Sequence, residues 1–138
     1  PQASWVIMAA AVADVRPGQT AIAKLPKKEL PTQLALEFVP DIVSQLSAQK
    51  TNQQLIVGFA AQTGDIISPA LSKLQRKQLD AIVANPIDKP DSGFGSLTNE
   101  ATILLAAREH TAAQSVKVPK TSKLDLSHQL YDCLLAIR

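Results

Sequence analysis

The stretch that decides the fold runs from residue 55 to residue 85 and reads LIVGFAAQTGDIISPALSKLQRKQLDAIVAN. It begins with a continuous apolar run, Leu55–Ala60, which is typical of a strand covered on both faces. After Gly64, apolar residues recur at positions 67, 70, 71 and 74, the spacing of one helix face. A second strand follows over Asp80–Asn85. The order of strand, helix and strand predicts a βαβ unit with a parallel sheet.

The residues before this unit predict two further strands and a helix. Trp5–Ala13 is continuously apolar, so we expect another buried strand there. Gln33–Val39 alternates, which predicts a half-exposed strand with Leu34, Leu36 and Phe38 on one face. Pro40 and Asp41 suit the first turn of a helix, and we expect that helix to end near Lys50.

After the unit, residues 86–98 are rich in Pro, Gly, Asp and Ser, which predicts a loop long enough to be functional. Residues 101–106 and 115–118 are interpreted as a strand pair at the sheet edge. Ser122 and Asp125 form a capping box before an amphipathic helix with apolar positions Leu126, Leu130, Cys133, Leu134 and Ile137. We therefore predict an α/β fold: a Rossmann-like three-layer sandwich with a mostly parallel sheet, helices on both faces and an antiparallel edge.

Composition limits the functions open to the chain. Its 138 residues suit one domain, although a strand that starts at Trp5 suggests part of a larger unit. With 14 basic and 12 acidic residues the net charge is +2, too little for nucleic-acid binding. The single cysteine, Cys133, excludes an internal disulfide and favours the cytosol. The apolar run that ends before Asp14 is too short to span a membrane.

Candidate ligand-binding residues are those that follow the buried strands, because ligands of open α/β sheets lie beyond the carboxyl ends of the strands. Lysines on the connection from the first strand and an i, i+4 lysine pair on the helix could hold phosphates. For the pair, spacing alone favours a solvated helix face over a phosphate site. The candidates are Asp14, Arg16, Gln62, Thr63, Asn85 and the loop around Phe94, with Lys24, Lys27, Lys28, Lys73 and Lys77 as the lysines.

Several familiar site signatures are absent from the sequence. Gly93 and Gly95 are followed by Thr98 where a dinucleotide fingerprint needs its third glycine, and the chain has no Walker loop. His110 and His128 have no nucleophile signature nearby, so we interpret both as surface residues. Cys133 lies on the apolar stripe of the last helix and is interpreted as a small buried hydrophobe.

Six strings, in order along the chain, resemble phosphopantothenoylcysteine synthetase, which in many bacteria is the C-terminal half of a bifunctional flavoprotein of coenzyme A biosynthesis. The strings are AAAVADVRP (9–17), KLPKK (24–28), VPDIV (39–43), VGFAAQT (57–63), KLQRKQLDAIVAN (73–85) and GFGSLTN (93–99). The resemblance implies a ligase that joins 4′-phosphopantothenate to cysteine through an acyl-cytidylate, with CTP as co-substrate and Mg²⁺ bound with it.

The resemblance also implies roles for individual residues. Lys24 matches a catalytic lysine that also holds phosphates, and Asp14 matches an aspartate near the ribose or the metal. The implied nucleotide-binding residues are Ala10, Asp14, Lys24, Phe59, Lys73 and Lys77, and further candidates are Lys27, Lys28, Asn85, Phe94 and Asn99. KLPKK is one residue longer than the usual motif, Gln62 replaces a common Glu, and Leu97 replaces a common Asp.

The resemblance covers residues 1–138 as the C-terminal portion of the ligase domain, without the Gly-rich N-terminal portion and the flavoprotein decarboxylase. It therefore implies no FMN on this chain, no nucleic-acid or membrane partner, and a homodimer to which Gln33–Val39 contributes. A second hypothesis treats the isolated chain as an inactive dimerisation and partial nucleotide-binding module. A third, DNA binding, fits the charge poorly.

Overall fold

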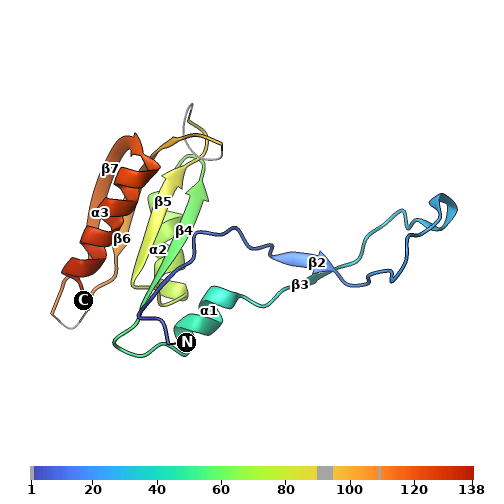
Figure 1. Ribbon diagram of the computed structural model, residues 1–138, viewed down its shortest axis with the longest axis horizontal. Coiled ribbons are helices and arrows are strands. Elements are labelled where there is room, and N and C mark those ends of the chain that lie inside the picture. The colour runs from blue at the N-terminus through green and yellow to red at the C-terminus, as the bar shows by residue number, and fades with distance from the viewer. Residues whose placement is uncertain (1, 90–94, 109) are drawn as a thin grey trace. The chain divides into compact units, whose positions relative to one another are not determined.

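The computed structural model describes residues 2–89, 95–108 and 110–138 (Figure 1). Its main feature is a five-stranded sheet in the order β1-β4-β5-β6-β7. The first three of these strands are mutually parallel, and β6 and β7 are antiparallel to their neighbours. The strands are β1 (Trp5–Ile7), β4 (Leu55–Gln62), β5 (Ala81–Pro86), β6 (Thr98–Leu105) and β7 (Gln114–Ser122). The helices are α1 (Ile42–Ala48), α2 (Ile67–Arg76) and α3 (Lys123–Ala136).

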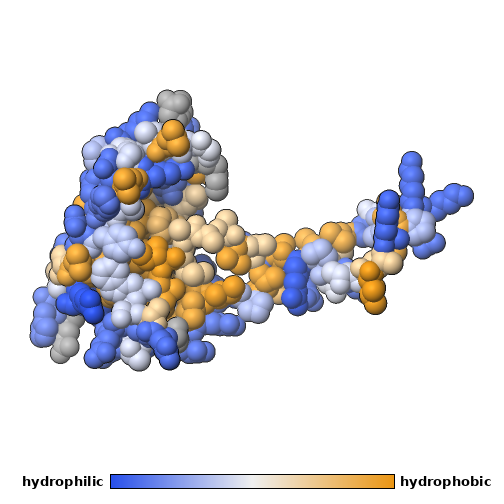
Figure 2. Space-filling model, in the orientation of Figure 1, coloured by the Kyte–Doolittle hydropathy of each residue, from blue (hydrophilic) through white to orange (hydrophobic). Residues whose placement is uncertain are grey.

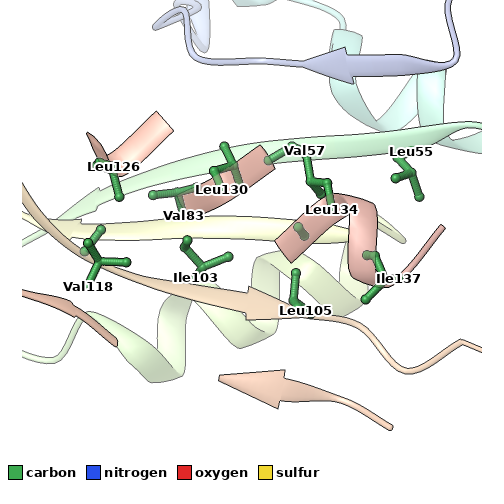
Figure 3. Packing of buried hydrophobic residues seen from close by; sticks show 12 residues of the cluster. Leu55, Val57, Val83, Ile103, Leu105, Val118, Leu126, Leu130, Leu134 and Ile137 are labelled. Atoms are coloured by element: carbon green, nitrogen blue, oxygen red, sulfur yellow. The ribbon is translucent and has the colours of Figure 1, made fainter. Parts of the chain in front are cut away.

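Two apolar clusters, one on each face of the sheet, form the core. On one face α3 buries Leu126, Leu130 and Leu134 against alternate residues of β4, β5 and β6 (Figure 3). On the other face α2 contributes Ala70 and Leu74, and α1 packs beside it. This confirms the three-layer α/β fold. In the described residues, no helix is long and apolar enough to cross a bilayer.

The central βαβ unit and the antiparallel edge are confirmed, with β7 longer than expected. The capping box is also confirmed: Ser122 Oγ accepts from the Asp125 amide at 3.0 Å and donates to Asp125 Oδ2 at 2.6 Å. The prediction of a buried strand over Trp5–Ala13 is wrong. Strand β1 covers three half-buried residues, because it lies at the edge of the sheet with β4 as its neighbour.

Residues Ala10–Ile42 form a second compact unit. Within it, β2 (Val15–Pro17) and β3 (Leu36–Phe38) make an antiparallel ribbon, and Lys27–Glu29 form a 3-10 turn. Gln33–Val39 was predicted to be half-exposed, with one face covered, but all three residues of β3 are exposed, and Phe38 is 87% exposed. The ribbon has no helix over it within this unit, so its apolar side chains stay in contact with solvent (Figure 2).

The amino-terminal edge of the parallel strands is held by a buried carboxylate. Asp80, just before β5, accepts from Lys50 Nζ at 2.8 Å, Arg108 Nη1 at 2.9 Å and the Ile56 amide at 2.8 Å. Next to it, Gln78 has a φ of 50°, and its carbonyl accepts from Lys50 Nζ and Ser47 Oγ, both at 2.7 Å. These contacts connect the end of α1 with the end of α2 and the start of β5.

Candidate functional site

The carboxyl ends of β4 and β5 lie together with the start of β6. Ala61 is opposite Asn85, and the Ile87 amide donates to the Gln62 carbonyl at 3.0 Å. Because β6 is antiparallel to β5, its first residues, including half-buried Asn99, return to the same edge. The sequence argument therefore correctly places Gln62 and Asn85 at one edge of the sheet, and Asn99, a further candidate from the resemblance, lies at the same edge.

Phe59 and Asn85 lie on the same face of the sheet near this edge. By strand alternation Phe59 shares a face with Val57, and Asn85 shares a face with Val83, both in the cluster under α3. Phe59 is 37% exposed, whereas Asn85 is 8% exposed. Ala61, directly opposite Asn85, has only a methyl side chain. An open aromatic ring beside a buried carboxamide can stack on a flat group and hydrogen-bond its edge.

The amino terminus of α2 lies at the same edge, but protein carboxylates already occupy its donors. Asp65 Oδ1 accepts from the amides of Ile67 at 2.9 Å and Ser68 at 3.2 Å. A hydrogen bond from the Ser68 side chain, followed by these amides, lowers the pKa of Asp65. Asp88 Oδ2 accepts from the Gly64 amide at 2.9 Å. A phosphate at this helix end would have to displace carboxylates. An Asp followed three residues later by Ser is the sequence signal for this cap.

The structure does not gather Lys73 and Lys77 beside Phe59. Helix α2 packs on the opposite face of the sheet, through Ala70 and Leu74. Lys77 directly precedes Gln78, at the edge where the parallel strands begin, and Lys73 is one turn earlier. Both side chains are half-buried. Their assignment to nucleotide binding stays a prediction, and it requires a ligand that reaches the α2 face.

The remaining lysines of the prediction lie in the second unit. Lys24, Lys27 and Lys28 are exposed on the connection between β2 and β3, where three cations follow one another within five residues. Asp14 directly precedes β2, and its carbonyl accepts from the Val39 amide at 3.0 Å. Ala10 is exposed at the start of the unit. The predicted site is therefore divided between two units, and Phe94 lies outside the described residues.

Asp14 is the carboxylate that the resemblance suggests as a metal ligand. In the described part of the chain, no three His, Cys, Asp or Glu side chains gather as a metal cage. Mg²⁺ in nucleotide sites is commonly held by one or two carboxylates together with substrate phosphates, so one aspartate fits a metal that arrives with a nucleotide.

The histidines lie at the surface, as predicted, whereas Cys133, predicted to be buried, is only partly buried. Cys133 packs against the α3 cluster, and burial, with the charge of Asp132, raises the pKa of its thiol. A raised pKa keeps the thiol protonated and unreactive near neutral pH. His110 and His128 are exposed. Sequence reasoning missed the network around Asp80, whose partners Lys50 and Arg108 are far from it along the chain.

Comparisons with known proteins identify the family of the chain and proteins that it resembles. The model of the family described as the DNA/pantothenate metabolism flavoprotein C-terminal domain matches residues 1–137. A curated relative from Vibrio cholerae, named coenzyme A biosynthesis bifunctional protein CoaBC, is 40% identical over 119 residues, which are 85% of this chain and 28% of the relative. Another, from an unknown prokaryotic organism and named cysteine/cysteine sulfinic acid decarboxylase, is 44% identical over 98 residues, covering 71% of this chain and 27% of the relative.

The chain thus spans less than a third of the length of these curated relatives. A solved structure, the C-terminal domain of a coenzyme A biosynthesis bifunctional protein CoaBC, matches with a TM-score of 0.71 at 24% identity. The match covers 99% of this chain and 55% of that one. The likeness shows that the two chains share their fold.

Proposed function

The chain belongs to the DNA/pantothenate metabolism flavoprotein C-terminal domain family, and on that premise we propose that its parent protein is a phosphopantothenate–cysteine ligase of coenzyme A biosynthesis. The observation that carries the proposal is the family match over residues 1–137, which includes the lysine-rich KLPKK segment and the strand that ends in VGFAAQT. The coenzyme A biosynthesis relative, 40% identical over most of this chain, supports it.

The proposed reaction has two steps, because a carboxylate is a poor electrophile. The carboxylate oxygen of 4′-phosphopantothenate attacks the α-phosphorus of CTP, the bond to the β-phosphate oxygen breaks, and pyrophosphate leaves. The cysteine amine then attacks the acyl carbon of the acyl-cytidylate, loses a proton to solvent, and expels CMP. Negative charge builds on phosphate oxygens in both steps, and fixed cations stabilise such charge.

Each candidate residue is assigned a role that its side chain can perform. We assign Lys24 the catalytic contact to phosphate oxygens, with Lys27 and Lys28 as further cations on the same segment. Phe59 and Asn85 offer a stacking ring and a carboxamide at the carboxyl edge of the sheet. Asp14 would hold Mg²⁺, which when bound with the nucleotide neutralises phosphate charge. Lys73 and Lys77 would contact the nucleotide from the α2 side.

We also propose that the protein acts as a homodimer through the ribbon of the second unit. Residues opposite each other in an antiparallel pair share a face, so Val15 lies beside Phe38 and Pro17 beside Leu36. Arg16 and Glu37 make an ion pair of 2.6 Å on the other face. One face of the ribbon is therefore apolar and exposed, as expected of a surface that a second copy covers.

Light scattering tests the dimer. The wild-type chain is expected to have twice its monomer mass, and Phe38→Asp is expected to be monomeric. The matched control is Leu71→Asp, a half-exposed leucine on α2. A wild-type chain that stays monomeric at high concentration would contradict the proposal.

Turnover by the parent protein tests the ligase assignment. Lys24→Gln removes a charge-assisted contact worth about 1.5–3 kcal/mol, and more if the contact tightens in the transition state, so pyrophosphate release should fall at least about tenfold. Lys117→Gln, an exposed lysine on β7, is the matched control and should keep wild-type turnover. Assays with CTP and with ATP define the nucleotide. Unchanged turnover by Lys24→Gln would remove the catalytic role.

For the isolated 138-residue chain, the second hypothesis is a dimerisation and partial nucleotide-binding module without activity. It is favoured by the solved structure, in which this chain corresponds to only 55% of the domain. Calorimetry with CTP distinguishes the hypotheses: the module binds CTP without releasing pyrophosphate, and Lys73→Ala and Lys77→Ala weaken that binding. Release of pyrophosphate by this chain alone would contradict the module hypothesis.

A further inference from the structure

Helix α2 ends in a Schellman motif that has glutamine where glycine is usual. The Leu79 amide donates to the Leu74 carbonyl at 3.0 Å, and the Gln78 amide donates to the Gln75 carbonyl at 3.1 Å. The apolar contact that often accompanies the motif is present too, because Leu74 and Leu79 are buried in the same cluster. The motif requires a left-handed residue at position 78, and Gln78 has a φ of 50°. A residue with a side chain therefore holds a conformation that favours glycine.

Two donors at the end of α1 hold the carbonyl of this residue. Ser47 Oγ and Lys50 Nζ both donate to the Gln78 carbonyl at 2.7 Å. Ser47 is only 5% exposed, so its hydroxyl is shielded from solvent. A non-glycine residue persists in the left-handed region where its surroundings fix it, and such residues cluster at ligand-binding and switch regions. The hydrogen bonds from α1 thus fix the backbone direction at residue 78.

The fixed turn directly follows the two lysines that the proposed function places at the nucleotide. The Lys77 amide donates to the Lys73 carbonyl at 3.0 Å, so Lys77 is the residue that caps the helix. On the other side of Gln78, Leu79 is anchored in the core. A change in the backbone angles of Gln78 must therefore move the last turn of α2. Lys77, next to the turn, would move more than Lys73.

We propose that Ser47 is a positioning residue for Lys77. Its hydroxyl holds the Gln78 carbonyl, the carbonyl fixes the left-handed turn, and the turn keeps the Lys77 ammonium where it contacts the nucleotide. A misplacement of about 1 Å is enough to weaken such a contact strongly. The inference rests on the proposed function, which supplies the nucleotide and assigns Lys77 to it.

Calorimetry with CTP on the parent protein tests the inference. Ser47→Ala should raise the dissociation constant at least about threefold, because the binding-competent turn is then only partly populated. Lys77→Ala should raise it at least as much, since it removes the ammonium itself. The control is Leu134→Ala, which destabilises the fold from the face of the sheet opposite α2 and should keep wild-type affinity. Wild-type affinity of Ser47→Ala would overturn the inference.

A second substitution separates positioning from a general loss of stability. Glycine adopts the left-handed region without a Cβ penalty and is the usual residue of this motif. Gln78 is exposed, so Gln78→Gly changes the backbone preference and little packing. Added to Ser47→Ala, it should return the dissociation constant to within about twofold of the wild-type value. A double variant that binds CTP as weakly as Ser47→Ala would overturn the inference.

Hydrogen exchange on the parent protein without nucleotide reports the turn itself. The Leu79 amide closes the motif, so Ser47→Ala should speed its exchange at least about threefold relative to the amides of β6, and adding Gln78→Gly should restore it. A parent protein that binds no CTP would overturn the proposed function, and the inference with it. A parent protein that binds CTP, but in which Ser47→Ala leaves the exchange of Leu79 unchanged, would overturn the inference alone.

Discussion

Replacing Asp80 by Asn should destabilise the protein strongly, because the carboxylate serves three donors while its side chain is only 9% exposed. The amide keeps the shape but loses the charge, so Lys50 and Arg108, whose side chains are 23% and 25% exposed, lose their counterion. Breaking a buried pair from one side costs about 3–5 kcal/mol, and partial hydration of the two cations places the expected loss near the lower end, at about 3 kcal/mol.

Urea unfolding followed by circular dichroism measures this loss. Slopes for small proteins are about 1–3 kcal/mol per molar urea, so the midpoint should fall by about 1–3 M with an unchanged slope. Glu37→Gln is the matched control, because it removes the same charge from an ion pair whose side chains are 64% and 48% exposed and should cost no more than about 1 kcal/mol. Equal midpoints for the two variants would refute the argument.

Three further predictions concern packing and pH. Leu134→Ala empties a fully buried position under α3 and should cost about 2–5 kcal/mol in the same urea experiment; a loss below 1 kcal/mol would contradict the described core. A Cβ at Gly58 would lie 2.7 Å from Leu79 Cδ1, so Gly58→Ala should cost about 1–3 kcal/mol, and adding Leu79→Val should recover part of it; independent, additive effects would argue against the overlap. Hydrogen bonds lower the pKa of both Asp65 and Asp125 from the ordinary value of 3.8. The two ionised carboxylates therefore stabilise the fold above that pH, and this stabilisation is lost as the pH falls through their lowered pKa values. Replacing both with Asn should reduce the loss of stability at acid pH, and an unchanged loss would exclude their contribution.

The central part of the fold could be predicted because its signals are local. Leu55–Gln62 and Ile67–Arg76 each carry the apolar spacing of their own element, and Ser122 with Asp125 marks the start of α3 within four residues. The β2–β3 ribbon was not predicted, because its pairing joins Val15 to Phe38 across a long connection. The local sequence of a strand does not show which distant strand it pairs with.

The site was predicted less completely for a related reason. Spacing correctly puts Lys73 on α2, but the helix ends at Arg76, so Lys77 is the residue that follows its last turn. The face of the sheet and the end of the strands that these lysines reach depend on the crossover of α2. Asn85 could be placed, because the end of a buried strand fixes its position in the sheet. The Asp80 network could not be predicted, since Lys50 and Arg108 approach from segments 30 and 28 residues away.

The left-handed conformation of Gln78 has a mechanical consequence. The unit of residues 10–42 is joined to the sheet at both ends, directly by β1 and, from Ile42 on, by helix α1. The end of α1 is tied by Ser47 and Lys50 to the Gln78 carbonyl, whose direction depends on the positive φ of that residue. Tension is thereby passed to the backbone at the start of β5. Along the α1 connection, tension on residues 10–42 therefore reaches β5, a strand whose residues are all buried.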